Sequence, residues 1–439
     1  MTAIIKNDIR VFNANQFINA FSKRNYSVWE TATAYSIGDI VTNGSYKYIA
    51  TSAGTSGATP PTHTSGAASD GGVDWMYVEV AANTSFYENN LYVAIGKVTE
   101  WTGEPNPDAP LDDDATKYPD LAQVLSAKRL ESNSVSYAIE RVDWVSGMAI
   151  DEYDPTIESF AYTNPFYVFT DENNIYKCLH NHAGSVSTSK PTGTAVDPFI
   201  TADSFVWQYM GTVDASQAIQ FLTSGYVPVV KKLSDDGSAQ WNVQQNAKPG
   251  SVSTVNMTDG GTGYTTATVT FDAAPAGGTD AQGTAIIQGG VITEIQVTTV
   301  GEGYETTPGV TITGDGADAT AVAVLAPKEG HGANILEELN ARFIVINSRF
   351  DDTEGGYFPI TGENDFRQIQ LIVDPKDVNG NIASAPRYIG PDHDDWDGAE
   401  TSGKSEFMKG SGTTLYVENI APVVRSSGQI EDVKVVLKF

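Results

Sequence analysis

Cysteine is almost absent from this chain. Cys178 is the only one in 439 residues, so no intramolecular disulfide can form. Long apolar runs are absent too, since no stretch approaches the roughly 18 uninterrupted apolar residues of a membrane-spanning helix. The first residues lack the apolar run and small-residue cleavage site of a secretory signal. These absences predict a protein that matures in a reducing cytosol and is neither secreted nor membrane-spanning.

Basic side chains are also scarce. The chain has 26 Lys and Arg residues against 55 Asp and Glu residues, which gives a formal net charge of −29. Nucleic acid and anionic lipid carry the same sign, so neither nucleic-acid binding nor membrane insertion is expected. Surplus negative charge keeps an abundant protein soluble and slows premature self-association, which suits a subunit that waits for its place in an assembly.

Glycine and proline are plentiful, with 41 and 20 copies among few charged residues. This composition suits short strands and turns better than long helices, and the length corresponds to about three domains. We therefore predict a mainly β chain of the α+β class with a few short helices. Helices are expected at 8–22, with Asn13 as N-cap, at 119–128 and at 333–341.

The C-terminal residues 432–439, DVKVVLKF, alternate apolar and polar side chains. This alternation predicts a strand tied into a sheet, because a loose apolar tail would fray and aggregate. Residues 415–424, LYVENIAPVV, are expected to pair nearby, with Pro422 at an edge or bulge where its missing N–H costs no ladder bond.

Two stretches of the chain repeat each other. Tyr46-Lys47 recurs as Tyr176-Lys177, and Trp75 recurs as Trp207. The two copies predict one small β unit that is used twice. Their pattern of Tyr, Gly, Pro-Thr and Trp resembles the small β modules of chitin-binding type.

A second repeat is clearer. Residues 255–271 align with 295–312, which superimposes two Gly-x-Gly-Tyr turns: Gly261, Gly263 and Tyr264 on Gly301, Gly303 and Tyr304. Each copy reads as strand, glycine-rich turn, strand, with Val and Thr dominating the strands. Two copies predict one compact all-β domain.

Three further segments combine into one pattern. They are 328–351, 357–375 and the C-terminal 418–439. A Y-x-E-N-x-x-P-x-x-R motif overlaps the last of them, matched by Tyr416, Glu418, Asn419, Pro422 and Arg425. Together these segments resemble the baseplate wedge subunit, of the gene-product-eight type, in large contractile-tailed phages. The family's basic-Asp-Trp pattern is matched by Arg141, Asp143 and Trp144.

The resemblance implies a β-sandwich main body that carries small inserted β modules. The body is expected to comprise 1–25, 83–248 and 328–439, with a small aromatic module inserted at 26–82 and the duplicated β-repeat domain at 250–326. The resemblance also implies a homodimer in the virion, in the tail baseplate, assembled in the host cytoplasm. It would contact other wedge proteins and support baseplate assembly and tail contraction.

Two glycine-rich motifs imitate phosphate-binding loops. Residues 398–405, GAETSGKS, satisfy G-x-x-x-x-G-K-[ST], but acidic PDHDDWD precedes them where a P-loop needs an apolar strand. We therefore predict an acidic surface loop there. Residues 314–319, GDGADA, imitate a dinucleotide fingerprint but precede a strand pattern, so we predict the turn of a β repeat.

No chemistry is predicted from the remaining motifs. His180 and His182 alternate as H-x-H and could supply two metal ligands if a third lay nearby, but the chain has only five histidines and the homologous position in the first copy is Thr51, which is no ligand. There is no G-x-S-x-G and no H-E-x-x-H. We predict no catalytic residue, no cofactor, no metal and no enzymatic activity.

The aromatic side chains of the module at 26–82 allow two interpretations. They are Trp29, Tyr35, Tyr46, Trp75 and Tyr77. The preferred interpretation is that these rings form the core of a module too small to bury enough aliphatic surface. The alternative is a sugar-stacking platform, which would make the chain a peripheral carbohydrate-binding tail protein with weak glycan contact at the host surface.

Overall fold

The structure is a computed structural model, and most of the chain can be described from it. The described residues are 7–21, 27–35, 39–44, 46–80, 90–96, 124–155, 162–182, 184–350, 365–376, 382, 387–389, 411–423 and 431–439. Within them, 48% of residues lie in strands and 10% in four helices, and many of the sheets are small and antiparallel. The predicted mainly β, α+β class is therefore confirmed, while the sandwich arrangement of the main body stays a prediction.

The chain divides into two compact units. Unit 1 comprises Met1–Asn15, Val135–Asn347 and Lys434–Phe439, and unit 2 comprises Gln16–Ser134 and Ser348–Val433. The duplicated β-repeat region belongs to unit 1 and the small aromatic module to unit 2. The predicted domain boundaries stay predictions.

A four-stranded sheet contains the C-terminal strand. Its order is β17 (Tyr226–Val229), β10 (Val135–Glu140), β24 (Phe343–Phe350), β28 (Glu431–Lys438). The predicted strand at the C-terminus is confirmed, and its alternation buries Val433 and Val435. Residues 415–424 are expected to pair nearby, but 415–423 lie in β27 (Ser411–Val423), which belongs to a different sheet from β28.

The helices are short, as expected. Within the described residues they are α1 (Asn7–Phe21), α3 (Ala215–Phe221), α4 (Ala239–Gln245) and α5 (Ile335–Glu338), with a 3-10 turn at Ser132–Ser134. The opening helix is confirmed, but Asn13 lies inside it and is not its N-cap. The helix expected at 333–341 is confirmed in its central part by α5.

The helix expected at 119–128 is wrong where the structure describes it. Residues 124–128 belong to strand β9 (Val124–Arg129), which pairs with β8 (Leu91–Gly96). All six residues of β8 are buried. Pairing against a fully buried strand overrides the weak local preference for helix.

These two strands belong to a five-stranded sheet of unit 2. Its order is β26 (Arg387–Ile389), β9, β8, β25 (Phe366–Lys376), β27 (Ser411–Val423). The central strand β8 is apolar and buried on both faces, whereas β25 carries polar residues and is partly exposed. Among the strands that the structure describes, β27 lies at the edge, so Pro422 is in an edge strand, as predicted.

The first repeat is confirmed by strand order. In the first copy the sheet runs β1 (Ser27–Val28), β3 (Ile40–Asn43), β4 (Tyr46–Ala50), β7 (Val73–Val80), β6 (Ala67–Asp70), with a separate pair β2 (Ala34–Tyr35) and β5 (Gly54–Thr55). In the second copy it runs β12 (Tyr167–Phe169), β13 (Asn174–His180), β16 (Val206–Thr212), β15 (Phe199–Ile200), with a pair β11 (Met148–Ala149) and β14 (Val186–Ser187). Strands β3-β4-β7-β6 therefore match β12-β13-β16-β15, and Trp75 and Trp207 are both fully buried.

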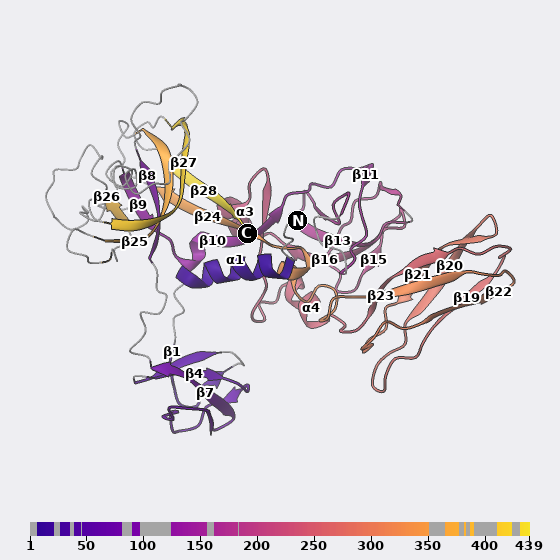
Figure 1. Cartoon of the computed structure of the whole chain (residues 1–439), viewed down its shortest axis with the longest axis horizontal. Helices are drawn as coiled ribbons and strands as arrows, with labels where there is room; N and C mark the ends of the chain where they lie inside the picture. Colours follow the sequence, from indigo (N-terminus) through magenta and orange to yellow (C-terminus); the bar gives the residue numbers. More distant parts are fainter. Residues whose placement is uncertain are drawn as a thin grey trace, which may run out of the picture. The chain divides into compact units, whose positions relative to one another are not determined.

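The labelled strands of the second repeat, β19 to β23, lie together in one group (Figure 1). The strands of this repeat are β18 (Val252–Asp259), β19 (Ala267–Phe271), β20 (Gln282–Gln288), β21 (Val291–Thr299), β22 (Val310–Gly314) and β23 (Thr320–Leu325). The first strand of each copy pairs with the third strand of the other, β18 with β23 and β21 with β20, and the two middle strands pair together. Neither copy can complete a sheet alone, so the duplicated region folds as one unit.

Glycine is required at the repeated turns. Gly261 and Gly301 have φ of 62° and 67°. A Cβ at Gly261 would lie 2.3 Å from the carbonyl oxygen of Ala317. The neighbouring Tyr264 and Tyr304 are both buried, so the turn also places a ring in the core of each copy.

Candidate functional site

Strand β27 carries the C-terminal motif of the resemblance. It is 13 residues long and pairs with β25 on one side. In the described part of the chain no other strand pairs with it. Tyr416 and Asn419 are half-buried, Glu418 is exposed, and no described side chain of β27 is fully buried. Arg425 lies outside the described residues.

The segment 328–351, by contrast, builds the core of unit 1. Strand β24 is buried along most of its length, and Ile335 and Leu336 of α5 lie in the same apolar cluster as Met210. The part of 357–375 that the structure describes, 365–375, belongs mainly to β25. Two of the three resemblance segments therefore pack inside sheets, and the third reaches an edge.

A buried ion pair lies within this core. The Lys177 ammonium on β13 donates to the Glu338 carboxylate at the end of α5, and both side chains are almost fully buried. Glu338 also accepts the backbone N–H groups of Gly332 and Asn334, each at 2.9 Å. The carboxylate therefore fixes the turn before α5 as well as the lysine.

His331 extends this pair to strand β18. Its Nδ1 lies 2.8 Å from the Lys177 Nζ, and its Nε2 lies 2.8 Å from the Ser253 hydroxyl. Burial and the adjacent Lys177 charge hold the pKa of His331 well below its ordinary value. The neutral ring accepts from Lys177 through Nδ1 and donates to Ser253 through Nε2. Every member of the network has a partner, as a stabilising buried network requires.

The basic-Asp-Trp pattern forms local hydrogen bonds and a cation–π contact. Arg141 Nε donates to Asp143 Oδ1 at 2.9 Å, and its guanidinium lies 5.4 Å from the centre of the Phe169 ring. Trp144 Nε1 donates to the Ser187 hydroxyl at 3.0 Å. These contacts join the start of the second repeat copy to its own strands, which is a structural role.

The aromatic rings at 26–82 form a core. Trp75 and Tyr48 are fully buried, Tyr35 is 8% exposed, and Tyr35 packs edge-on against Trp75 with 4.9 Å between ring centres. Trp29, Tyr46 and Tyr77 pack against this cluster and are half-buried. The preferred interpretation is confirmed for the buried rings, while glycan contact through the module stays a prediction.

The glycine-rich motifs contain no described phosphate site. Residues 398–405 lie outside the described residues. Residues 314–319 connect β22 to β23, so the predicted β turn is confirmed. Cys178 is buried, which raises the pKa of its thiol well above the ordinary value and leaves it unreactive.

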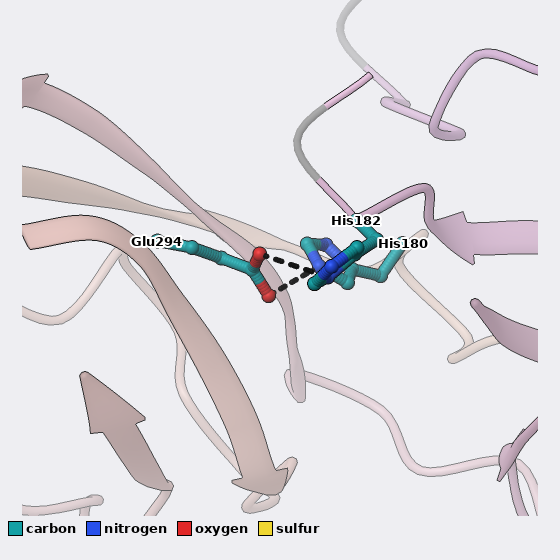
Figure 2. A group of neighbouring side chains, drawn as sticks. All are labelled: His180, His182 and Glu294. Atoms are coloured by element: carbon teal, nitrogen blue, oxygen red, sulfur yellow. Dashed lines mark ion pairs between the residues drawn. The ribbon is translucent and has the colours of Figure 1, made fainter. Parts of the chain in front are cut away.

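The structure brings the H-x-H motif beside an acidic residue that the sequence does not link to it. His180 ends β13, His182 follows in the next turn, and Glu294 lies on β21. His180 Nε2 is 2.5 Å from Glu294 Oε1, and His182 Nδ1 is 3.5 Å from Glu294 Oε2. One nitrogen or oxygen of each side chain lies within 4.8 Å of the others. Figure 2 shows both imidazoles turned toward the carboxylate.

A second carboxylate holds the other side of the His180 ring. Glu152 Oε1 lies 2.6 Å from His180 Nδ1 and also accepts the backbone N–H of Asn181 at 3.0 Å. Burial lowers the pKa of His180, but the close carboxylates of Glu152 and Glu294 favour the protonated ring, outweigh the effect of burial and raise the pKa to about 9. With the two carboxylates alone, the ring is therefore a buried imidazolium at neutral pH.

The contacts to Glu294 are short but poorly directed. Among the described residues, neither His180 Nε2 nor His182 Nδ1 makes a hydrogen bond of acceptable geometry, although both atoms are buried. An N–H donor aligned on an oxygen would satisfy that geometry. Both rings therefore face the carboxylate without a well-formed hydrogen bond to it. The three side chains can form ion pairs with one another, or they can serve together as metal ligands.

One feature of the sequence does single out Glu294. The second repeat places it opposite Thr254 of the first copy, so one copy has a carboxylate where the other has a hydroxyl. Glu294 is also buried, at 7% exposed, between the buried residues Ile292 and Ile295 of β21. A buried charged residue at a strand position where the other repeat copy is uncharged indicates a specific contact.

No family model matches the chain, and no curated protein is significantly similar to it in sequence. Among the described residues, no helix is both long and apolar enough to cross a membrane.

Proposed function

We propose that this protein is a structural subunit of a phage tail baseplate wedge, which acts through its sheet edges and catalyses no reaction. Its partners are a second copy of the chain and other wedge proteins, and it supports baseplate assembly and tail contraction. The observation that carries the proposal is the long edge strand β27, because the C-terminal motif of the resemblance lies on it.

An edge strand of this length is normally protected. Natural proteins blunt such edges with lysines, prolines or bulges, because unpaired N–H and C=O groups recruit other strands. Glu418 is the only charged residue among the 13 of β27, and Pro422 lies near its end. Leu415 is 51% exposed. An edge with a single charge and no lysine suits pairing with a partner better than permanent contact with water.

The buried side of the same sheet supports a structural role. Gln368 and Gln370 of β25 are almost fully buried, and Gln368 Nε2 donates to Asn419 Oδ1 of β27 at 2.8 Å. This contact fixes the register of the edge strand, so its outward atoms are presented in one arrangement. A fixed edge lowers the entropy cost of association.

The test is to block the edge. Leu415→Lys adds a charge to the exposed face of β27, and Val322→Lys is the matched control, since Val322 is 52% exposed on β23 of the repeat region. Analytical ultracentrifugation should show a dimer for the wild type and for Val322→Lys. Leu415→Lys should sediment as a monomer and should no longer co-purify with the products of neighbouring genes.

Two results would count against the proposal. A wild-type chain that stays monomeric and joins none of those products has no assembly role. If Leu415→Lys still dimerises and co-purifies like the control, β27 is not the contact edge.

A further inference from the structure

We propose that His180, His182 and Glu294 form a binding site for a divalent transition metal, and that Zn²⁺ fits this donor set best. Two imidazoles and one carboxylate are a known protein ligand set for zinc. The inference rests on contacts inside unit 1 and is independent of the proposed function.

A bound ion displaces the proton from His180 Nε2, and the outer contact then fixes the ring in the tautomer that binds metal. Glu152 Oε1, 2.6 Å from Nδ1, accepts the proton on that nitrogen. The Nε2 lone pair then faces Glu294. A carboxylate behind a ligating histidine is the usual outer contact of a zinc site, because it fixes the tautomer and orients the ring.

The separations are close to those that one ion requires. Ligand atoms about 2.0–2.1 Å from a tetrahedral zinc ion lie about 3.3 Å from each other. The contact of 3.5 Å between His182 Nδ1 and Glu294 Oε2 already has that spacing. The contact of 2.5 Å from His180 Nε2 to Glu294 Oε1 would open by about 1 Å when an ion replaces the direct contact. Rotation of the Glu294 side chain supplies such a shift without movement of β21.

The backbone around the motif is built to hold both rings. His182 has φ of 52°, a left-handed conformation that is unfavourable for a side chain with a Cβ. Asn181 stabilises this turn, since its Nδ2 donates to the Ile150 carbonyl at 2.9 Å and its Oδ1 accepts the Gly184 N–H at 2.9 Å. Strain held by specific hydrogen bonds is typical of a site that orients a side chain for a ligand.

The ligands join two strands that are far apart in the chain. An ion here would link the turn after β13 to β21 of the repeat region. Three protein ligands leave the fourth position for water, and a cleft lined by Glu152, His180 and Glu294 gives solvent access to it.

Metal binding can be measured on the full chain. After treatment with EDTA and its removal, calorimetric titration with ZnCl₂ should give one ion per chain. Co²⁺ in its place should give the visible absorption of a coordinated ion. Glu294→Thr, which installs the residue of the first repeat copy, should weaken Zn²⁺ binding by more than tenfold, and Glu152→Gln should weaken it by about 10- to 100-fold.

Two further variants keep the test decisive. Glu302→Gln removes an exposed carboxylate from the same region and should bind Zn²⁺ like the wild type. His182→Ala removes a side chain that is 36% exposed, against 7% for Glu294, so it replaces Glu294→Thr if that variant is unfolded. We expect a Kd in the micromolar range. The proposal is overturned if the wild type binds no Zn²⁺ at a free Zn²⁺ concentration about 100 times higher than that Kd. It is also overturned if the ligand variants bind as tightly as Glu302→Gln.

Discussion

The buried pair of Lys177 and Glu338 gives the sharpest prediction about stability. Glu338→Gln keeps the size of the side chain but removes the charge opposite Lys177, whose side chain is fully buried. The lysine then remains in a low-dielectric interior with uncharged neighbours, which are the substituted amide, His331 and the Tyr153 ring, whose centre lies 4.0 Å from the Lys177 Nζ. Loss of one partner from a buried ion pair costs about 3–5 kcal/mol, so unit 1 should lose that much of its free energy of unfolding.

The opposite substitution should cost less. In Lys177→Met the Glu338 carboxylate still accepts the N–H groups of Gly332 and Asn334. The double variant Lys177→Met/Glu338→Gln leaves no buried charge, so it should be more stable than Glu338→Gln alone. Coupling energies between residues in one network run to about 0.5–3 kcal/mol, and we expect the upper part of that range.

The pH dependence of stability in the Glu338→Gln variant is determined by the protonation of Lys177. Burial lowers the pKa of Lys177, and Glu338 is the group that opposes this. Without Glu338 the folded-state pKa falls further below the unfolded value of about 10.4. The destabilisation is therefore greatest at neutral pH and shrinks as the pH rises toward the unfolded pKa, where both states carry a neutral lysine.

Hydrogen exchange is the suitable assay, because a chain of two units need not unfold in one step. Amides of β13 and β16 report the stability of unit 1, and they should lose protection in Glu338→Gln. Lys190→Met, which breaks a surface pair with Asp171, is the control and should leave this protection unchanged. A loss below about 1 kcal/mol in Glu338→Gln would refute the argument, since that is the range of an exposed pair.

Three further predictions concern other parts of the chain. Trp75→Ala should cost about 3–5 kcal/mol and make the module at 26–82 sensitive to protease, whereas a protease-resistant variant that loses polysaccharide binding would favour the platform interpretation. Burial raises the pKa of Asp203, but hydrogen bonds from the Thr201 hydroxyl and the backbone N–H groups of residues 188–189 outweigh it and lower the pKa. Its stabilisation is present above the unfolded pKa of about 3.9 and is lost as the pH falls below it, so Asp203→Asn should flatten the fall in urea midpoint between pH 5 and 3. Removal of 430–439 deletes β28 and should abolish dimerisation in ultracentrifugation, and a truncated chain that still dimerises would make β28 peripheral.

The sequence alone determined the features that depend on local pattern. Alternation predicted the C-terminal strand, and repeated Gly, Tyr and Trp residues predicted both duplicated β regions, because turns and strand faces are encoded over a few residues. It failed at 124–128, where a helical composition lies in a strand paired to buried β8. There the partner strand, which no local pattern reveals, determined the conformation.

Only the tertiary structure decided how the strands of the two repeat copies pair with one another. The sequence shows two copies at 255–271 and 295–312, but the exchange of strands between them appears in the pairing of β18 with β23 and of β21 with β20. The same packing brings Glu294 to His180 and His182, which the sequence places in a different repeat. Side chains so far apart in the chain meet through the burial of whole strands, and a pattern of single residues does not encode that contact.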